Sequence, residues 1–227
     1  MKLRIGIAVW AVIAAASVCA AQRRVTFPLV SGSRTVAGDL YGSGTRGLVL
    51  AHGGRFDEKS WKPQAEEFAR AGFLVLAVRF RGDGLNPDGT PSANGSDADN
   101  AADVIAAAWF MRKTGAKTVD AIGGSLGGDA VGEADAQSPG TFDRVVFLGS
   151  EGGDAPEKLT GRKLYLVARD DRSADGLRLP GIEAHYKRAP EPKKLVVVDG
   201  SAHAQYLFAT DEGPAVMKTI MEFLTAR

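Results

Sequence analysis

The amino-acid sequence predicts an α/β fold: one domain with a mostly parallel sheet, helices on both faces and an N-terminal antiparallel hairpin. Short apolar runs alternate with helix-compatible segments along nearly the whole chain, which is the order expected of strand–helix–strand units. Most of these runs are continuously apolar, as is typical of strands buried on both faces. Residues 22–227, which follow a predicted leader, are numerous enough for one domain with a sizeable core.

Residues 1–21 have the features of a secretory signal peptide. A basic start precedes an apolar stretch at residues 5–16 that is too short to span a bilayer comfortably, and small residues then precede a cleavage position near Ala20 or Ala21. We therefore expect a periplasmic or secreted protein. An uncleaved N-terminal anchor is the alternative interpretation of the same residues.

The composition excludes several classes of protein. Cys19 is the only cysteine and lies in the leader, so the mature chain can have neither a disulfide nor a cysteine nucleophile. The whole chain has 28 basic and 27 acidic residues, and removal of Lys2 and Arg4 leaves it close to neutral. Without a basic stripe, we expect no nucleic-acid partner and no membrane attachment once the signal peptide is cleaved.

The first elements after the leader are a hairpin, a strand and a helix. Two partly alternating runs, residues 25–30 and 35–41, are separated by Ser-Gly-Ser, which predicts the antiparallel hairpin. Residues 47–51 are continuously apolar and predict a buried strand. The helix that follows is predicted to begin with Ser60 as its N-cap and to end at Gly72.

The rest of the chain continues this alternation. Residues 73–78 predict a buried strand, and a stretch rich in Gly, Asp, Asn and Pro then leads into a helix from residue 97 to about residue 113. Further strands are predicted at residues 119–122, 144–148, 163–167 and 194–198, and further helices after residue 128, at residues 182–188 and at residues 217–224.

The most informative turn is Gly123-Gly124-Ser125-Leu126-Gly127, which joins a predicted strand to a predicted helix. A serine at the tip of such a turn has an exposed hydroxyl, and glycines two residues before and after it let strand and helix pass closely. The bare G-x-S-x-G pattern also arises as an ordinary glycine-rich turn, so its meaning depends on the partners available to Ser125.

A serine hydroxyl needs a base to become a good nucleophile, and the sequence has three histidines. His203 lies in a loop just past the strand at 194–198, at the end of the sheet where open α/β folds place their ligands. We interpret His52 as a structural residue that braces the loop after a central strand. His185 lies in a largely polar helical stretch and is predicted to be a solvated surface residue.

A base of this kind needs a carboxylate to orient it, and two candidates follow the strand at 163–167. We favour Asp171 over Asp170, which can instead cap the turn, and Glu151 or Asp154 is the fallback. The order Ser, Asp, His along the chain then matches a known arrangement of catalytic triads.

The developing oxyanion needs backbone donors. The N–H of Leu126 is one candidate, and the second is expected from Gly54 or Arg55.

Together, the His52-Gly53-Gly54 turn, the Arg81-Gly82-Asp83-Gly84 turn, the Ser125 elbow, Asp171 and His203 resemble the α/β-hydrolase family over nearly the whole mature chain. The resemblance implies Ser125 as nucleophile, His203 as base and Asp171 as its partner. The short length is most similar to the small, lidless, dienelactone-hydrolase-like branch. That branch often has Cys where this chain has Ser125, and Asp83 stands where the related loop commonly has His.

We therefore expect an exported serine hydrolase that cleaves small acyl esters or thioesters, with a small-molecule substrate and no cofactor. A small serine peptidase and a catalytically silent binding module of the cell envelope are the alternatives. No metal is expected, because Asp97, Asp99 and Asp103 lack the Gly and Glu of a calcium loop and are better explained as carboxylates at a helix N-terminus. The sequence makes no prediction of oligomeric state.

Overall fold

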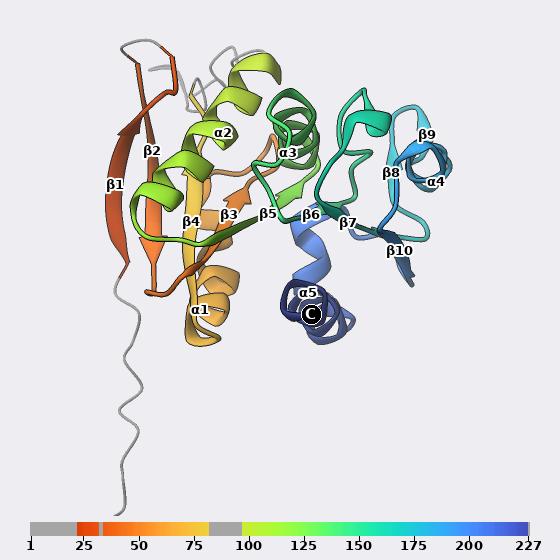
Figure 1. The fold of residues 1–227 in the computed structure, drawn as a ribbon. Coiled ribbons are helices and arrows are strands. Elements are labelled where there is room, and N and C mark those ends of the chain that lie inside the picture. The colour runs from red at the N-terminus through yellow and green to blue at the C-terminus, as the bar shows by residue number, and fades with distance from the viewer. Residues whose placement is uncertain (1–21, 32–33, 82–96, 227) are drawn as a thin grey trace, which may run out of the picture.

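The structure is a computed structural model that describes residues 22–31, 34–81 and 97–226 (Figure 1). The predicted signal peptide, residues 1–21, lies outside the described residues, as does the part of the Arg81-Gly82-Asp83-Gly84 turn that follows Arg81. Among the helices that the structure does describe, none combines the length and the apolar character needed to cross a bilayer.

The centre of the fold is an eight-stranded sheet in the order β1-β2-β4-β3-β5-β6-β7-β10. β2 pairs antiparallel with both β1 and β4, whereas every other pair in this sheet is parallel. The strands are β1 (Arg23–Pro28), β2 (Thr35–Tyr41), β3 (Arg46–Ala51), β4 (Phe73–Arg79), β5 (Thr118–Gly124), β6 (Arg144–Leu148), β7 (Arg162–Ala168) and β10 (Lys193–Val198). A separate short hairpin pairs β8 (Arg172–Ser173) with β9 (Gly176–Leu177). The predicted mostly parallel sheet with an N-terminal hairpin is confirmed.

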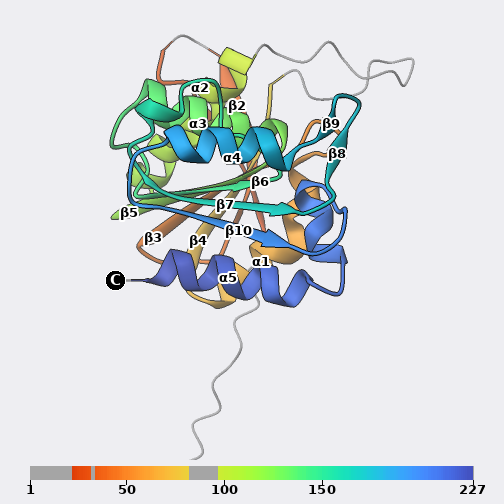
Figure 2. The same cartoon turned by 90° about the vertical axis from the view of Figure 1, so that its right-hand side faces the viewer.

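Helices cover both faces of the sheet, as predicted (Figures 1 and 2). One face carries α2 (Asp97–Lys113), α3 (Leu126–Gln137) and α4 (Leu179–Arg188), and the other carries α1 (Lys62–Arg70) and α5 (Gly213–Thr225). Three short 3₁₀ helices complete the described elements: η1 (Glu58–Trp61), η2 (Pro156–Lys158) and η3 (Ala204–Ala209).

The prediction that Ser60 caps the first helix is wrong. A 3₁₀ turn, η1, precedes α1, and its N-cap is Asp57, whose Oδ1 accepts a hydrogen bond from the Lys59 N–H at 3.0 Å. Asp57 is a better acceptor for an unpaired N–H because its carboxylate also interacts favourably with the positive end of the turn. Ser60 instead uses its hydroxyl to donate to the Asp57 carbonyl oxygen at 2.5 Å.

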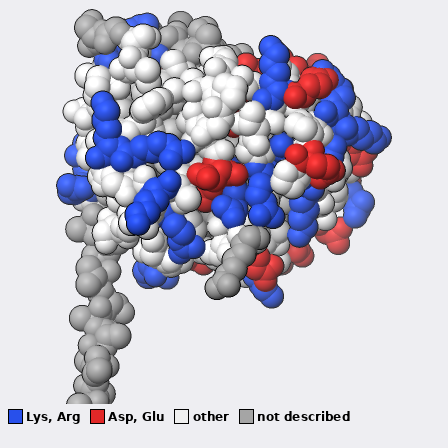
Figure 3. Space-filling view, viewed as in Figure 1, with Lys and Arg blue, Asp and Glu red and all other residues white. Residues whose placement is uncertain are grey.

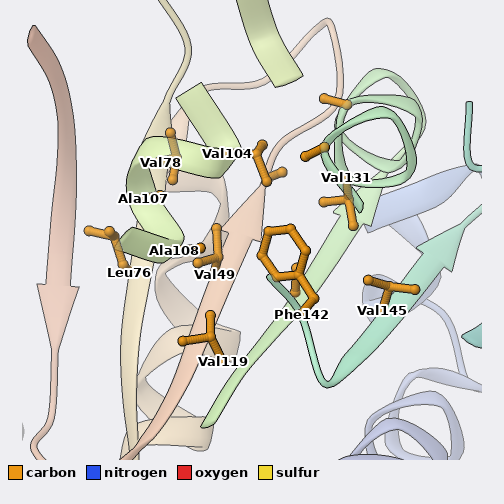
Figure 4. Close-up of a cluster of buried hydrophobic side chains, with 14 of the residues drawn as sticks. Val49, Leu76, Val78, Val104, Ala107, Ala108, Val119, Val131, Phe142 and Val145 are labelled. Carbon is orange, nitrogen blue, oxygen red and sulfur yellow. The ribbon is translucent and has the colours of Figure 1, made fainter. Parts of the chain in front are cut away.

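Two apolar cores lie on opposite faces of the sheet. In the larger one, valines of three adjacent strands, Val49, Val119 and Val145, point toward α2 and α3, and Phe142 fills the space between them (Figure 4). Alanines such as Ala107 and Ala108 on α2 let that helix lie close to the sheet. Burial of apolar surface contributes roughly 25 cal/mol per Å² to the free energy of folding. The core on this face therefore stabilises the central strands of the sheet.

In Figure 3, Lys and Arg side chains lie on both sides of the view, whereas Asp and Glu side chains lie in its centre and on its right. Asp120 instead lies inside, in β5, with 2% of its surface exposed. Burial raises the pKa of Asp120 to about 7, although Arg144, whose Nη1 lies 3.8 Å from its Oδ1, opposes the shift.

Asp120→Asn is expected to stabilise the protein at pH 8 but much less at pH 4. The folded state holds a proton on Asp120 that the unfolded chain releases above about pH 4, so the stability of the wild type falls as pH rises from 4 to 7. The gain at pH 8 should be about 2–4 kcal/mol, since one pKa unit corresponds to about 1.4 kcal/mol. Urea unfolding at both pH values measures it. The matched change at exposed Asp175 should have no such effect, and equal gains at both pH values would contradict this explanation.

Candidate active site

The turn between β5 and α3 holds Ser125 in a backbone conformation that L-residues rarely adopt, with φ 52° and ψ −121°. Such a conformation costs about 1–3 kcal/mol and persists only where its surroundings enforce it. Here the Ser125 N–H donates to the Leu148 carbonyl at 3.0 Å, and the Ser125 carbonyl accepts from the N–H groups of Gly128 and Asp129. The turn is therefore fixed to β6 on one side and to α3 on the other.

Two glycines make this turn possible. A Cβ on Gly123 would overlap the carbonyl of Gly127, and a Cβ on Gly127 would overlap the backbone of Ala51 and His52. The close passage of strand and helix thus excludes a side chain at the two positions that flank the serine by two residues, which is the local geometry of a nucleophile elbow.

Asp171 and His203 meet at the same end of the sheet. Asp171 follows β7 and is buried, and His203 follows β10 and keeps 28% of its side chain exposed. His203 Nδ1 lies 2.8 Å from Asp171 Oδ2, which fits an N–H donating to a carboxylate. The neighbouring Asp170 is exposed, and its backbone N–H donates to the Gly200 carbonyl. Of the two candidate carboxylates, the structure brings Asp171 to the imidazole.

Arg178 and Gly149 complete the surroundings of this pair, and both were missed in the sequence. The Arg178 N–H donates to the Asp171 carbonyl at 2.9 Å, and its Nε lies 3.5 Å from Asp171 Oδ1. Gly149, which follows β6, has φ 57°, and a Cβ there would lie 2.9 Å from Asp171 Oδ2 and 3.0 Å from His203 Nδ1. A glycine at 149 therefore lets the Asp–His pair close against the end of β6.

A cavity of about 390 Å³ opens at this point, and Ser125 and Gly149 both line it. The rest of its lining includes four carboxylates and one guanidinium, and consists of Asp129, Glu133, Gln137, Ser150, Glu151, Gly153, Asp154, Arg178 and Ile182. Burial raises the pKa of Asp129, whereas a 2.6 Å hydrogen bond from the Ser150 hydroxyl opposes the shift. Ser125 thus borders a space in which a small ligand fits.

The two fallback carboxylates lie in this wall rather than at the imidazole. Glu151 and Asp154 are exposed, and Glu151 Oε2 lies 3.0 Å from His185 Nε2. The prediction that His185 is a solvated surface residue is therefore wrong, because only 15% of its side chain is exposed. The helical stretch around His185 is largely polar in sequence. Its contact with Glu151, which lies in a loop far away in the chain, could not be read from that stretch.

The two residues that would supply the oxyanion donors, Leu126 and Gly54, are neighbours in space. Leu126 is the first residue of α3, where backbone N–H groups have no partner within the helix. A Cβ on Gly54 would lie 3.5 Å from Leu126 Cδ2, so the loop after β3 adjoins the elbow. The N–H of Gly53 already donates to Gln205 Oε1 at 2.8 Å. His52 is fully buried and packs on Phe80, with ring centroids 4.8 Å apart.

Comparison with known proteins agrees with this geometry. A family model described as the alpha/beta hydrolase fold matches residues 47–209. No curated protein matches the chain. Among solved structures, a dienelactone hydrolase from Anabaena variabilis is 22% identical, with a TM-score of 0.73 over 90% of this chain and 96% of its own.

Two esterase structures are also similar to this chain in fold, at lower sequence identity. One, from Pyrococcus furiosus, is 15% identical, with a TM-score of 0.72 over 90% of this chain and 92% of its own. Another, from Thermogutta terrifontis, is 16% identical, with a TM-score of 0.68 over 89% of this chain and 98% of its own. At sequence identities this low, the structural similarity shows a shared fold and no more. The family predicted from the sequence is confirmed, and because the family model spans more than half of its residues, the chain belongs to the alpha/beta hydrolase fold family.

Proposed function

We propose that this protein is a serine hydrolase that cleaves small acyl esters or thioesters, with Ser125 as nucleophile, His203 as base and Asp171 as its partner. Membership of the alpha/beta hydrolase family supports a hydrolytic function. The observation that carries the finer assignment is the 2.8 Å contact between His203 and Asp171 beside a cavity that Ser125 lines. A fold alone does not define an activity, so the assignment depends on these three side chains.

The reaction follows from the properties of these groups. His203 takes the proton of the Ser125 hydroxyl through Nε2, because Nδ1 is committed to Asp171. The serine oxygen attacks the acyl carbon, and the oxyanion that forms is bound by the N–H groups of Leu126 and Gly54. His203 then protonates the departing alcohol or thiol. Water, activated in the same way, releases the acid from the acyl-enzyme.

The size of the cavity supports small substrates. At about 390 Å³ it lies near the lower end of the range of ordinary ligand sites, which is about 300–1,000 Å³. The carboxylates in its walls disfavour an anionic acyl group close to Ser125, because like charges repel. Neutral short-chain esters are therefore the expected substrates.

A graded series of p-nitrophenyl esters tests the proposal directly. We expect the mature wild-type chain to hydrolyse the acetate and butyrate esters faster than the decanoate ester, and to react covalently with a fluorophosphonate probe. The labelled peptide should contain Ser125. A folded protein that neither hydrolyses any ester of the series nor reacts with the probe would contradict the proposal and favour a binding role.

We also propose that the protein is exported, on the basis of its basic and apolar N-terminus. Expression of the full chain followed by N-terminal sequencing of the released protein tests this. A mature chain that begins near residue 21 or 22 is expected. Recovery of the intact N-terminus, in a form that stays with the membrane fraction, would instead favour the uncleaved anchor.

A further inference from the structure

Two loops at the site that are far apart in the sequence are tied together by side chains. One, residues 53–61, follows β3 and carries the candidate donor Gly54, and the other, residues 203–208, carries His203. Two ring contacts join them: Phe56 with Tyr206 at 5.0 Å between centroids, and Trp61 with Phe208 at 5.9 Å. Aromatic pairs of this kind attract each other beyond the burial of their surface, so they hold the two loops together.

Gln205 makes the polar contacts between the same two loops. Its Oε1 accepts from the Gly53 N–H at 2.8 Å, and its Nε2 donates to the Ser60 hydroxyl at 2.7 Å. The Ser60 hydroxyl donates in turn to the Asp57 carbonyl. Only 8% of Gln205 is exposed, so these partners take the place of water for both ends of its amide.

The same side chain also contacts the turn of the nucleophile. A Cβ on Gly124, the residue before Ser125, would lie 3.4 Å from Gln205 Cγ and 3.4 Å from Gln205 Oε1. Gln205 therefore packs against the serine turn while it binds the loop after β3. The backbone between His203 and Gln205 is strained as well, since Ala204 has φ 52°. Strain of this kind persists only where contacts on both sides hold it.

We infer that Gln205 is a positioning residue for the proposed hydrolysis: it holds the loop that bears Gly54 in place relative to Ser125 and His203. It acts through the Gly53 N–H, which anchors the loop one residue before the N–H of Gly54. This inference rests on the proposed function. A displacement of about 1 Å in such a group can cost about a hundredfold in rate, because catalysis depends on donors that are already in place.

The test compares Gln205→Met with Gln64→Met, the same chemical change in α1 outside the site. Methionine keeps the length of the side chain but loses both hydrogen bonds. We expect kcat per active site, counted by fluorophosphonate titration, to fall about tenfold to a hundredfold in Gln205→Met, with KM changed less than about twofold. Gln64→Met should match the wild type. A residue that serves stability alone would lower Tm and the number of active sites but leave kcat per active site unchanged.

Ser60→Ala gives a second measurement that perturbs the fold less, because it removes only one partner of Gln205. We expect a smaller loss of kcat, and no further loss when it is combined with Gln205→Met, since Ser60 acts through that amide. If Gln205→Met does not fold, an unchanged kcat in Ser60→Ala overturns the inference.

The outcomes separate the two proposals. An active wild type with undiminished kcat per active site in Gln205→Met overturns the role of Gln205 and leaves the proposed function intact. A wild-type chain that is inert toward every ester and toward the probe overturns the proposed function, and the role of Gln205 with it.

Discussion

Ser125→Ala is expected to lower kcat for ester hydrolysis by about five to six orders of magnitude. In the proposed mechanism the Ser125 hydroxyl attacks the acyl carbon from its position at the tip of the turn between β5 and α3, and alanine has no atom that can replace it. The protein should keep its fold, because alanine adopts the strained backbone of this turn at a cost similar to that of serine. Initial rates with p-nitrophenyl acetate and labelling by a fluorophosphonate probe measure the effect.

Ser201→Ala is the matched control for this prediction. Ser201 is exposed and lies two residues before His203, so its substitution removes a hydroxyl near the site that takes no part in the reaction. The Ser201→Ala variant should hydrolyse p-nitrophenyl acetate at the rate of the wild type. Substantial hydrolysis and labelling by a folded Ser125→Ala variant would show that another residue is the nucleophile.

Asp171→Asn is expected to lower kcat by about ten-thousandfold while leaving the structure largely unchanged. The Asp171 carboxylate lies 2.8 Å from His203 Nδ1, and in the proposed mechanism it stabilises the imidazolium that forms when the base takes a proton. An asparagine amide can present its NH₂ group to Nδ1, which favours the wrong tautomer of the ring. Measured kcat values, together with Tm by circular dichroism, separate this effect from unfolding.

Asp170→Asn tests whether the loss is specific to Asp171. The two residues are adjacent, but Asp170 is exposed and its contact with the chain is made by its backbone. We therefore expect near wild-type kcat from Asp170→Asn. A folded Asp171→Asn enzyme with full activity, or an equal loss in both variants, would remove Asp171 from the proposed triad.

Much of the fold could be predicted because it depends on patterns that are local in sequence. The apolar runs that become β3, β4, β6 and β7, and the mostly apolar run that becomes β5, are buried on both faces, and each is short enough to be a strand. The predicted helix starts were less accurate. α4 begins at Leu179 and α5 at Gly213, each a few residues before the apolar pattern from which the helix was predicted. Both starts have a proline in the first turn, which fits that position because its missing N–H is not needed there.

The candidate site was predictable where a residue type is required in one turn or follows the end of a predicted strand, as Asp171 and His203 do. Ser125 and its flanking glycines could be recognised because steric limits apply within the turn itself. Gln205 and Gly149 could not, because their roles arise from partners far away in the chain: Gln205 binds Gly53 across 152 positions, and Gly149 faces Asp171 and His203. The partner of His185 was missed for the same reason. No periodicity in a single sequence reports such contacts.

The strained backbone of Ser125 also has a consequence for stability. Glycine would adopt φ 52° without penalty, and the turn already consists mostly of glycine. Ser125→Gly would therefore relieve the strain of this turn while it removes the hydroxyl. Under the proposed function, the same position sets stability against activity.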